Sequence, residues 1–151
     1  MSSTTRHAPA STDEAEILTL VEGLHRAHRE KNPEAIAAPF ASHAVIYDLE
    51  PPLSHDGISI ERKRNWLATW ETPIELTAQD FKVVVSGDHA YGYGYLHMSG
   101  TPKAAGRRVS FWMRATICFE RVDDTWRIVH EHTSVPFYMD GSLRPAFDLV
   151  P

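Results

Sequence analysis

The chain has 151 residues, of which 42% are hydrophobic, and a net charge of −5. This length and composition predict one domain with a single core, and the negative charge argues against nucleic acid as a partner. The single cysteine, Cys118, excludes an intrachain disulfide and fits a reducing compartment. No apolar run is long enough to cross a membrane, and Met1–Ser11 lacks the apolar core of a secretory signal. We therefore expect a soluble, cytoplasmic protein.

Helix signals dominate the first part of the chain. Residues 1–10 are rich in Ser, Thr, Ala and Pro and are expected to be a disordered tail. Ser11–Glu14 is a capping box, and an apolar stripe at helical spacing follows it: Ile17, Leu20, Val21, Leu24 and Ala27 with His28. Asn32 can cap a second helix that runs to about Phe40.

Short elements then lead into a strand-rich half. We expect a strand over 44–49, a loop over 54–57 and a third helix from about Ser59 to Trp70, with Trp66 and Trp70 on one face. Four strands are predicted after it: Phe81–Ser86, Ala90–Ser99, Arg107–Arg121 and Trp126–Val135. Segregated helices and strands indicate an α+β domain over 11–137. A curved antiparallel sheet wrapped around three N-terminal helices would enclose a conical cavity.

The last strand carries ionisable groups on both of its faces. Strict alternation places Val129, Glu131 and Thr133 on one face of the strand. The opposite face carries Trp126, Ile128, His130 and His132. Two histidines two residues apart could suggest a metal site, but no third ligand is evident, so no metal is expected. A histidine-bearing surface for a homodimer through the sheet is the preferred interpretation.

Three segments resemble the cystatin-like family of nuclear transport factor 2, ketosteroid isomerase and the SnoaL-like polyketide cyclases. Phe40–Asp48 is similar to the family pattern F-A-x-D-A-x-x-x-D, and Gly57 precedes the third helix as the family's glycine does. The segments Arg114–Thr116 and Trp126–Ser134 resemble the SnoaL-like subfamily, which includes the association domain of calcium/calmodulin-dependent kinase. The resemblance covers about residues 12–137 and implies the α+β cone.

The resemblance also implies roles for individual positions. The general base of the isomerase matches Asp48, whereas its two oxyanion donors match Thr116 and Leu24. The base position is thus kept and the donors are not, which argues against steroid isomerisation. Pocket arginines of the kinase association domain match His97 and Thr133. The resemblance therefore implies that Val129, Glu131 and Thr133 face the cavity and that the opposite face, with both histidines, looks outward.

Pairing of the last two strands about the turn Asp123–Asp124 extends this prediction. It places Trp112, Arg114 and Thr116 on the cavity side beside Glu131. An Arg114–Glu131 pair would either orient a polar ligand group or be purely structural.

Asp48 is the leading candidate for a general base, because a carboxylate near apolar walls binds its proton more tightly. Alternatively, it caps the strand end in solvent. His97 and His28 are further acid–base candidates, or hydrogen-bonded wall residues.

Aromatic residues could line the same cavity. Tyr91, Tyr93 and Tyr95 alternate with glycines, and they form either an aromatic wall with hydroxyl donors or packing at a curved sheet. Trp66 and Trp112 allow the same two interpretations.

Together these features predict a SnoaL-like protein that binds a small hydrophobic carbonyl compound, polyketide-like or steroid-like. It would catalyse isomerisation, cyclisation or dehydration by proton transfer without a cofactor. Asp48 would be the base, Arg114 with Tyr95 or His97 would stabilise the oxyanion, and Glu131 would hold Arg114. The alternative is a non-catalytic ligand-binding or oligomerisation module.

The C-terminal tail, 138–151, is too apolar for a solvated end and is expected to dock on the body or on a partner subunit.

Overall fold

The computed structural model describes residues 12–151, so the predicted N-terminal tail and Ser11 of the capping box lie outside the described residues. Within that range the helices are α1 (Thr12–Arg29), α2 (Pro33–Ala37) and α3 (Ile60–Leu67). The strands are β1 (Phe40–Tyr47), β2 (His55–Asp56), β3 (Glu75–Ser86), β4 (His89–Gly100), β5 (Val109–Val122) and β6 (Thr125–Ser134). The α+β class is as predicted.

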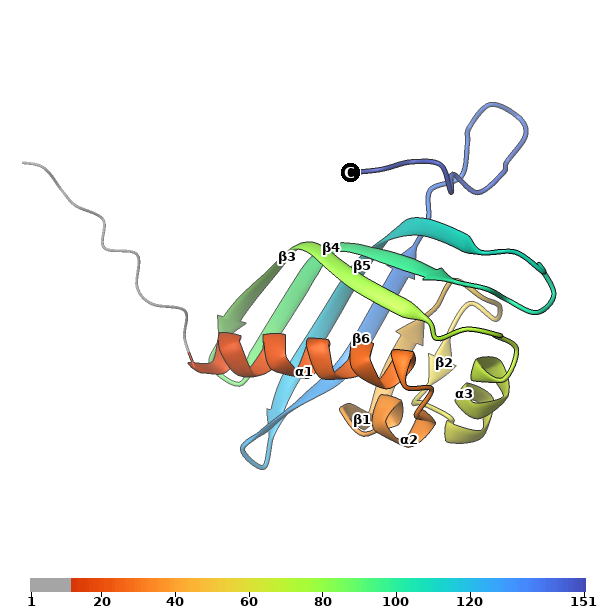
Figure 1. The fold of residues 1–151 in the computed structure, drawn as a ribbon. Coiled ribbons are helices and arrows are strands. Elements are labelled where there is room, and N and C mark those ends of the chain that lie inside the picture. The colour runs from red at the N-terminus through yellow and green to blue at the C-terminus, as the bar shows by residue number, and fades with distance from the viewer. Residues whose placement is uncertain (1–11) are drawn as a thin grey trace, which may run out of the picture.

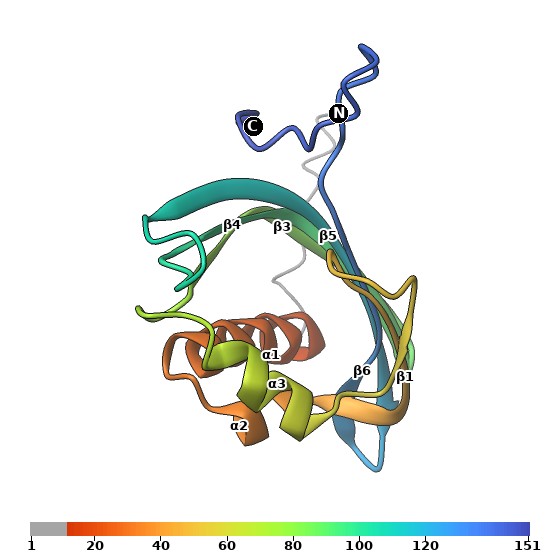
Figure 2. The ribbon, with the colours of Figure 1, turned by 90° about the vertical axis from the view of Figure 1, so that its right-hand side faces the viewer.

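The strands form one sheet in the order β2-β1-β6-β5-β4-β3. It curves around the helices, with α1 and α3 on its concave side (Figures 1 and 2). One detail of the prediction is wrong, because the sheet is mixed: β1 runs parallel to β6. A strand precedes the third helix as predicted, but β1 is followed by the further short strand β2 before α3 begins.

The helices begin where the sequence indicates. The Asn32 side chain accepts a hydrogen bond from the Ala35 amide (3.1 Å), and Ser59 caps α3 in the same way. The apolar stripe of α1 is buried against the inner face of the sheet, and its core members are Ile17, Val21, Leu24 and Ala27. Burial of each large apolar side chain contributes about 1.5–3 kcal/mol, so this stripe fixes α1 across the sheet.

One extra residue in β6 decides which side chains face the cavity. Phe119 pairs with Ile128 and Cys118 pairs with His130, so Val129 has no partner on β5. This is a β-bulge, in which two residues on one strand oppose one on the other. Val129 therefore does not line the cavity, contrary to the prediction.

The bulge changes the alternation along β6. Trp126 and Ile128 before it are buried in the core, at 3% and 0% exposure. Glu131 and Thr133 after it also face inward and line a pocket. The prediction for Glu131 and Thr133 holds, whereas the outward placement of Trp126 and Ile128 is wrong.

The same bulge reverses the predicted faces of β5 and β4. Met113, Ala115 and Ile117 point into the protein and are buried, so the residues alternating with them point outward. The outward set comprises Trp112, Arg114 and Thr116 on β5, and Tyr91, Tyr93, Tyr95 and His97 on β4.

The C-terminal tail folds back on itself after β6. The Tyr138 amide donates a hydrogen bond to the Arg144 carbonyl oxygen (2.9 Å), and the Phe147 ring contacts the Phe111 ring of β5 with 4.6 Å between centroids. Among the described residues, no helix is both long and apolar enough to span a membrane.

Candidate functional site

A pocket of about 170 Å³ lies between the concave face of the sheet and the helices α1 and α3. Its floor is apolar and is supplied by β3, β4 and β5. Its polar groups come from α1, α3, β6 and the segment after β1. The lining residues are Leu24, His25, His28, Asp48, Leu49, Glu50, Lys63, Trp66, Leu76, Leu96, Met98, Met113, Ile117, Glu131 and Thr133.

Glu131 is the most perturbed acid in this pocket. It lies in the middle of the sheet, paired with Ile117 of β5 and Ile46 of β1. Burial raises the pKa of its carboxyl group from 4.5 to about 7, a rise that nearby Asp48 increases and Lys63 opposes. No hydrogen bond or ion pair to this carboxyl group occurs within residues 12–151. The group can therefore gain or lose a proton near neutral pH.

Lys63 is the cation of the pocket. Its Nζ lies 3.9 Å from Oδ2 of Asp48 and 5.1 Å from the centre of the Trp66 ring. Asp48 also accepts a hydrogen bond from the Leu49 amide (2.9 Å). The side chains of Lys63 and Asp48 are partly shielded from solvent, at 22% and 30% exposure respectively. Asp48 and Trp66 thus hold the ammonium group at the pocket wall.

Two histidines of α1 face the pocket as neutral imidazoles. Burial lowers the pKa of both His25 and His28 to about 4. Nδ1 of His28 lies 2.8 Å from the Leu24 carbonyl oxygen, so in the neutral ring Nδ1 is the donor and Nε2 is left as an acceptor. The His28 ring meets Trp66 edge-on at 6.1 Å.

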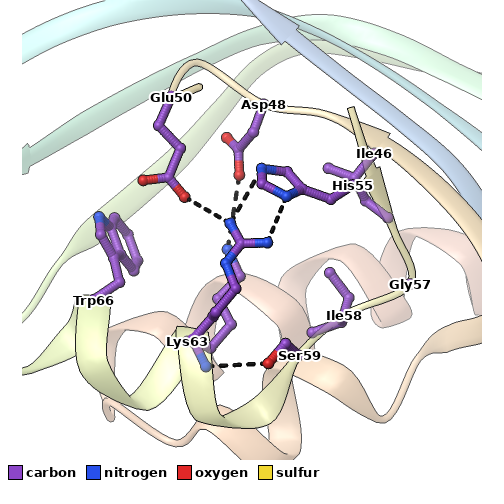
Figure 3. A pocket seen from close by; sticks show the side chains of 10 residues that line it. Ile46, Asp48, Glu50, His55, Gly57, Ile58, Ser59, Lys63 and Trp66 are labelled. Atoms are coloured by element: carbon purple, nitrogen blue, oxygen red, sulfur yellow. Dashed lines mark hydrogen bonds and ion pairs between the residues drawn. The ribbon is translucent and has the colours of Figure 1, made fainter. Parts of the chain in front are cut away.

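A smaller hollow of about 30 Å³ adjoins the pocket and shares Asp48, Glu50, Lys63 and Trp66 with it. Figure 3 shows Asp48, Glu50 and His55 reaching from the β1–β2 segment toward α3. Arg62 of α3 donates to Glu50 (3.2 Å) and contacts His55. The charge of Glu50 is thereby compensated on the outer side of the pocket.

The structure brings five of the predicted site residues together. Asp48, Glu131, His28, Trp66 and Thr133 all line the pocket. The predicted Arg114–Glu131 pair is wrong.

Arg114 pairs with Ser134 and donates a hydrogen bond to its hydroxyl group (3.2 Å) on the outer face. His97 also lies outside, where Nε2 bonds to Ser110 (2.6 Å) and the ring contacts Trp112. The other predicted lining residues that face away from the pocket are Tyr93, Tyr95, Trp112 and Thr116.

Among the ionisable residues of the site, sequence reasoning missed three: Lys63, His25 and Glu50. Lys63 lies three residues before Trp66, so the helical period alone puts both on one face of α3. His25 follows Val21 by four residues within the apolar stripe of α1. Both positions were recoverable from the same periodicity that located the helices.

The two outward histidines of β6 pack against an aromatic ring of β1. His130 and His132 contact the Tyr47 ring, with 4.8 and 5.4 Å between ring centroids. Nδ1 of His130 also lies 2.6 Å from the Val45 carbonyl oxygen. No group of three or more potential ligands is found in the part of the chain that the structure describes.

Comparison with known proteins identifies the family of this pocket-bearing cone. The model of the SnoaL-like domain matches residues 17–138, which is most of the chain. The chain belongs to the SnoaL-like family. The match includes most of α1, the whole sheet and every residue that lines the pocket. No curated relative matches the chain significantly.

Solved structures support the same fold for this SnoaL-like protein. A nuclear transport factor 2-like (NTF2-like) protein of unknown function from Pseudomonas putida KT2440 is 28% identical, covers 94% of this chain and 99% of its own, and has a TM-score of 0.82. A candidate dehydratase of the NTF2-like family from Streptomyces avermitilis is 18% identical. The match covers 84% of this chain and 98% of the dehydratase chain, with a TM-score of 0.72. A candidate association domain of calcium/calmodulin-dependent protein kinase II from Xanthomonas campestris is 21% identical. The match covers 89% of this chain and 96% of the association domain, with a TM-score of 0.71.

Proposed function

We propose that this SnoaL-like protein is an enzyme that moves a proton on a small carbonyl compound, with Glu131 as the acid–base group. The observation that carries the proposal is a half-buried carboxyl group that lines an apolar pocket, has no hydrogen bond or ion pair among the described residues, and has a pKa raised to about 7. A general base works best when its pKa lies near the working pH. The resemblance in fold to a candidate dehydratase is consistent with such chemistry.

The proposed reaction uses two groups of the pocket. The Glu131 carboxylate removes a proton from the carbon next to the carbonyl, and the electron pair of that C–H bond passes to the carbonyl oxygen. Lys63, held by Asp48, stabilises the resulting enolate. Glu131 then returns the proton to another carbon, which gives isomerisation, or to a departing hydroxide, which gives dehydration. These steps need no cofactor.

Asp48 stays a predicted alternative base, but its surroundings suit it better to positioning. It accepts a hydrogen bond from the Leu49 amide and pairs with Lys63, so its carboxyl group is already engaged in holding the ammonium group. Asp48→Asn should therefore weaken enolate stabilisation while leaving a measurable rate. Loss of all turnover in this variant would favour Asp48 as the base.

Exchange of carbon-bound hydrogen with solvent tests the proposal without knowledge of the substrate. Ketones of one to four rings would be incubated with the protein in deuterium oxide, and deuterium at the α-carbon would be followed by NMR. We expect exchange to rise as the pH increases through about 7, because the base must be ionised. Glu131→Gln should lower the exchange rate at least 100-fold, on the order expected for a general base.

Glu120→Gln is the matched control, since Glu120 contacts His43 and His89 away from the pocket. If no ketone exchanges faster with the protein than without it, the enzyme proposal fails. The non-catalytic binding module would then be the better account of the fold.

A further inference from the structure

The size of the pocket limits what it can hold. Its volume is about 170 Å³, whereas an apolar protein cavity of about 150 Å³ accommodates benzene. The space therefore suits one six-membered ring with a few further atoms. The steroid-like ligand expected from the sequence has four fused rings and would extend beyond this space.

The shape of the polar surface fixes how such a ring would lie. The floor opposite α1 is formed by Leu76, Leu96, Met98, Met113 and Ile117. Glu131 and Thr133 lie two residues apart on β6 and face the same space. A ring on the apolar floor would thus place a ring carbon at Glu131 and an adjoining carbonyl oxygen toward Lys63, while the rest of the ligand contacts carbon and sulfur.

The charges of the pocket select against anionic ligands. A carboxylate would add an anion beside Asp48 and Glu131, and Lys63 already pairs with Asp48 at 3.9 Å. Burying a charge without a free partner costs several kcal/mol, so a carboxylate is not accommodated well.

We propose that the ligand is a compound built on one six-membered ring, without a negative charge, with a single carbonyl oxygen directed to Lys63 and the neighbouring carbon at Glu131. This inference rests on the proposed function for the identity of the pocket as the active site. It concerns binding, however, and can be measured apart from catalysis.

Three probes test size and charge separately. Cyclohexanone has the proposed form, cyclohexanecarboxylate carries the same ring with a negative charge, and 2-decalone is neutral with two fused rings. Binding would be measured at pH 7.5 by NMR of the protein labelled with ¹³C at its methionine methyl groups. Met98 and Met113 line the pocket, whereas Met139 is 84% exposed in the tail and serves as an internal control.

We expect cyclohexanone to shift the Met98 and Met113 signals and to leave Met139 unchanged. Each of the other two probes should bind at least tenfold more weakly. Equal or tighter binding of cyclohexanecarboxylate or of 2-decalone would overturn the inference, as would the absence of any cyclohexanone effect at Met98 and Met113. Met98→Leu and Met113→Leu, two substitutions of similar volume, assign the signals.

The two proposals can fail independently. If cyclohexanone binds at Met98 and Met113 without any α-hydrogen exchange, the ligand class stands and the catalytic role of Glu131 falls. If exchange depends on Glu131 but only two-ring or anionic ketones are bound, the catalytic role stands and the ligand class is wrong.

Discussion

Burial of Glu131 should make the stability of the fold depend on pH. Its pKa in the folded protein is about 7, above the ordinary value of 4.5. The folded state therefore favours the protonated form, and stability is fully present below pH 4.5 and declines as the pH rises through 7. Ionising the group in the folded protein costs up to about 3 kcal/mol.

Glu131→Gln removes this ionisation and tests it. The free energy of unfolding of the variant, relative to the wild type, should increase by about 3 kcal/mol between pH 4.5 and pH 8.5, since only the wild type must bury a charge. Urea unfolding at both pH values measures the change. A difference between the proteins that is the same at both pH values would contradict a buried, perturbed carboxyl group.

His25 should act in the opposite direction. Burial, with a smaller effect of Arg29, lowers its pKa from 6.5 to about 4. The folded state favours the neutral ring, so stability is present above pH 6.5 and is lost as the pH falls through 4. His25→Leu should retain up to about 3 kcal/mol that the wild type loses between pH 7 and pH 4. Parallel acid unfolding curves for the two proteins would show that His25 does not titrate in this way.

At the scale of elements, the alternating tyrosines and glycines of β4 are explained by a bulge in β3. Gln79 pairs with Tyr95 and Lys82 pairs with Tyr93, so two residues of β3 oppose Gly94 alone. A Cβ atom on Gly94 would lie 2.7 Å from the Cα of Phe81. The glycine is therefore required by close approach of a neighbouring backbone.

Gly94→Ala should destabilise the fold by about 1–3 kcal/mol, because backbone atoms cannot move aside easily. Gly23→Ala is the matched control. Gly23 lies within α1 with no atom within 4 Å of the added methyl group, so the control should stabilise the protein by about 0.5–1 kcal/mol. Thermal unfolding of both variants measures the contrast, and equal stability of the two would refute the close-packed bulge.

Bulges also explain where prediction from sequence succeeded and failed. Helix starts, the succession of strands along the chain and the fold class follow from caps, periodicity and turns, as at Asn32 and in the α1 stripe. The extra residue at Val129 cannot be recognised from the pattern of polar and apolar residues in β6. It nevertheless shifts every residue pair between β5 and β6 beyond it by one position. Arg114 consequently lies opposite Ser134 on the outer face, and a pair that seemed central to the site does not exist.

At the scale of the whole molecule, the outer face of the sheet carries the tyrosines that were predicted to line the pocket. Tyr91, Tyr93 and Tyr95 are 40–47% exposed, and the first two stack with 6.3 Å between ring centroids. Association of two chains through the sheet, predicted from the sequence, stays a prediction. Such a face would supply the apolar area that a dimer buries.

Tyr93→Glu would place a negative charge in the middle of this face. If the protein is a dimer through the sheet, sedimentation equilibrium should show twice the chain mass for the wild type and a shift toward the single-chain mass for the variant. Thr125→Glu, in the exposed turn at the start of β6, is the control. A single-chain mass for the wild type, or an unchanged dimer in the Tyr93 variant, would contradict the prediction.

The proposed chemistry of the pocket depends on the ionisation of one group, and the direct measurement is an NMR titration of the Glu131 side-chain carboxyl carbon. Protein labelled with ¹³C in glutamate would be titrated from pH 4 to pH 9, with Glu131→Gln to assign the signal. We predict a midpoint at about pH 7 for Glu131. A midpoint near 4.5, the ordinary value for glutamate, would mean that the carboxyl group is fully solvated, and would contradict its acid–base role.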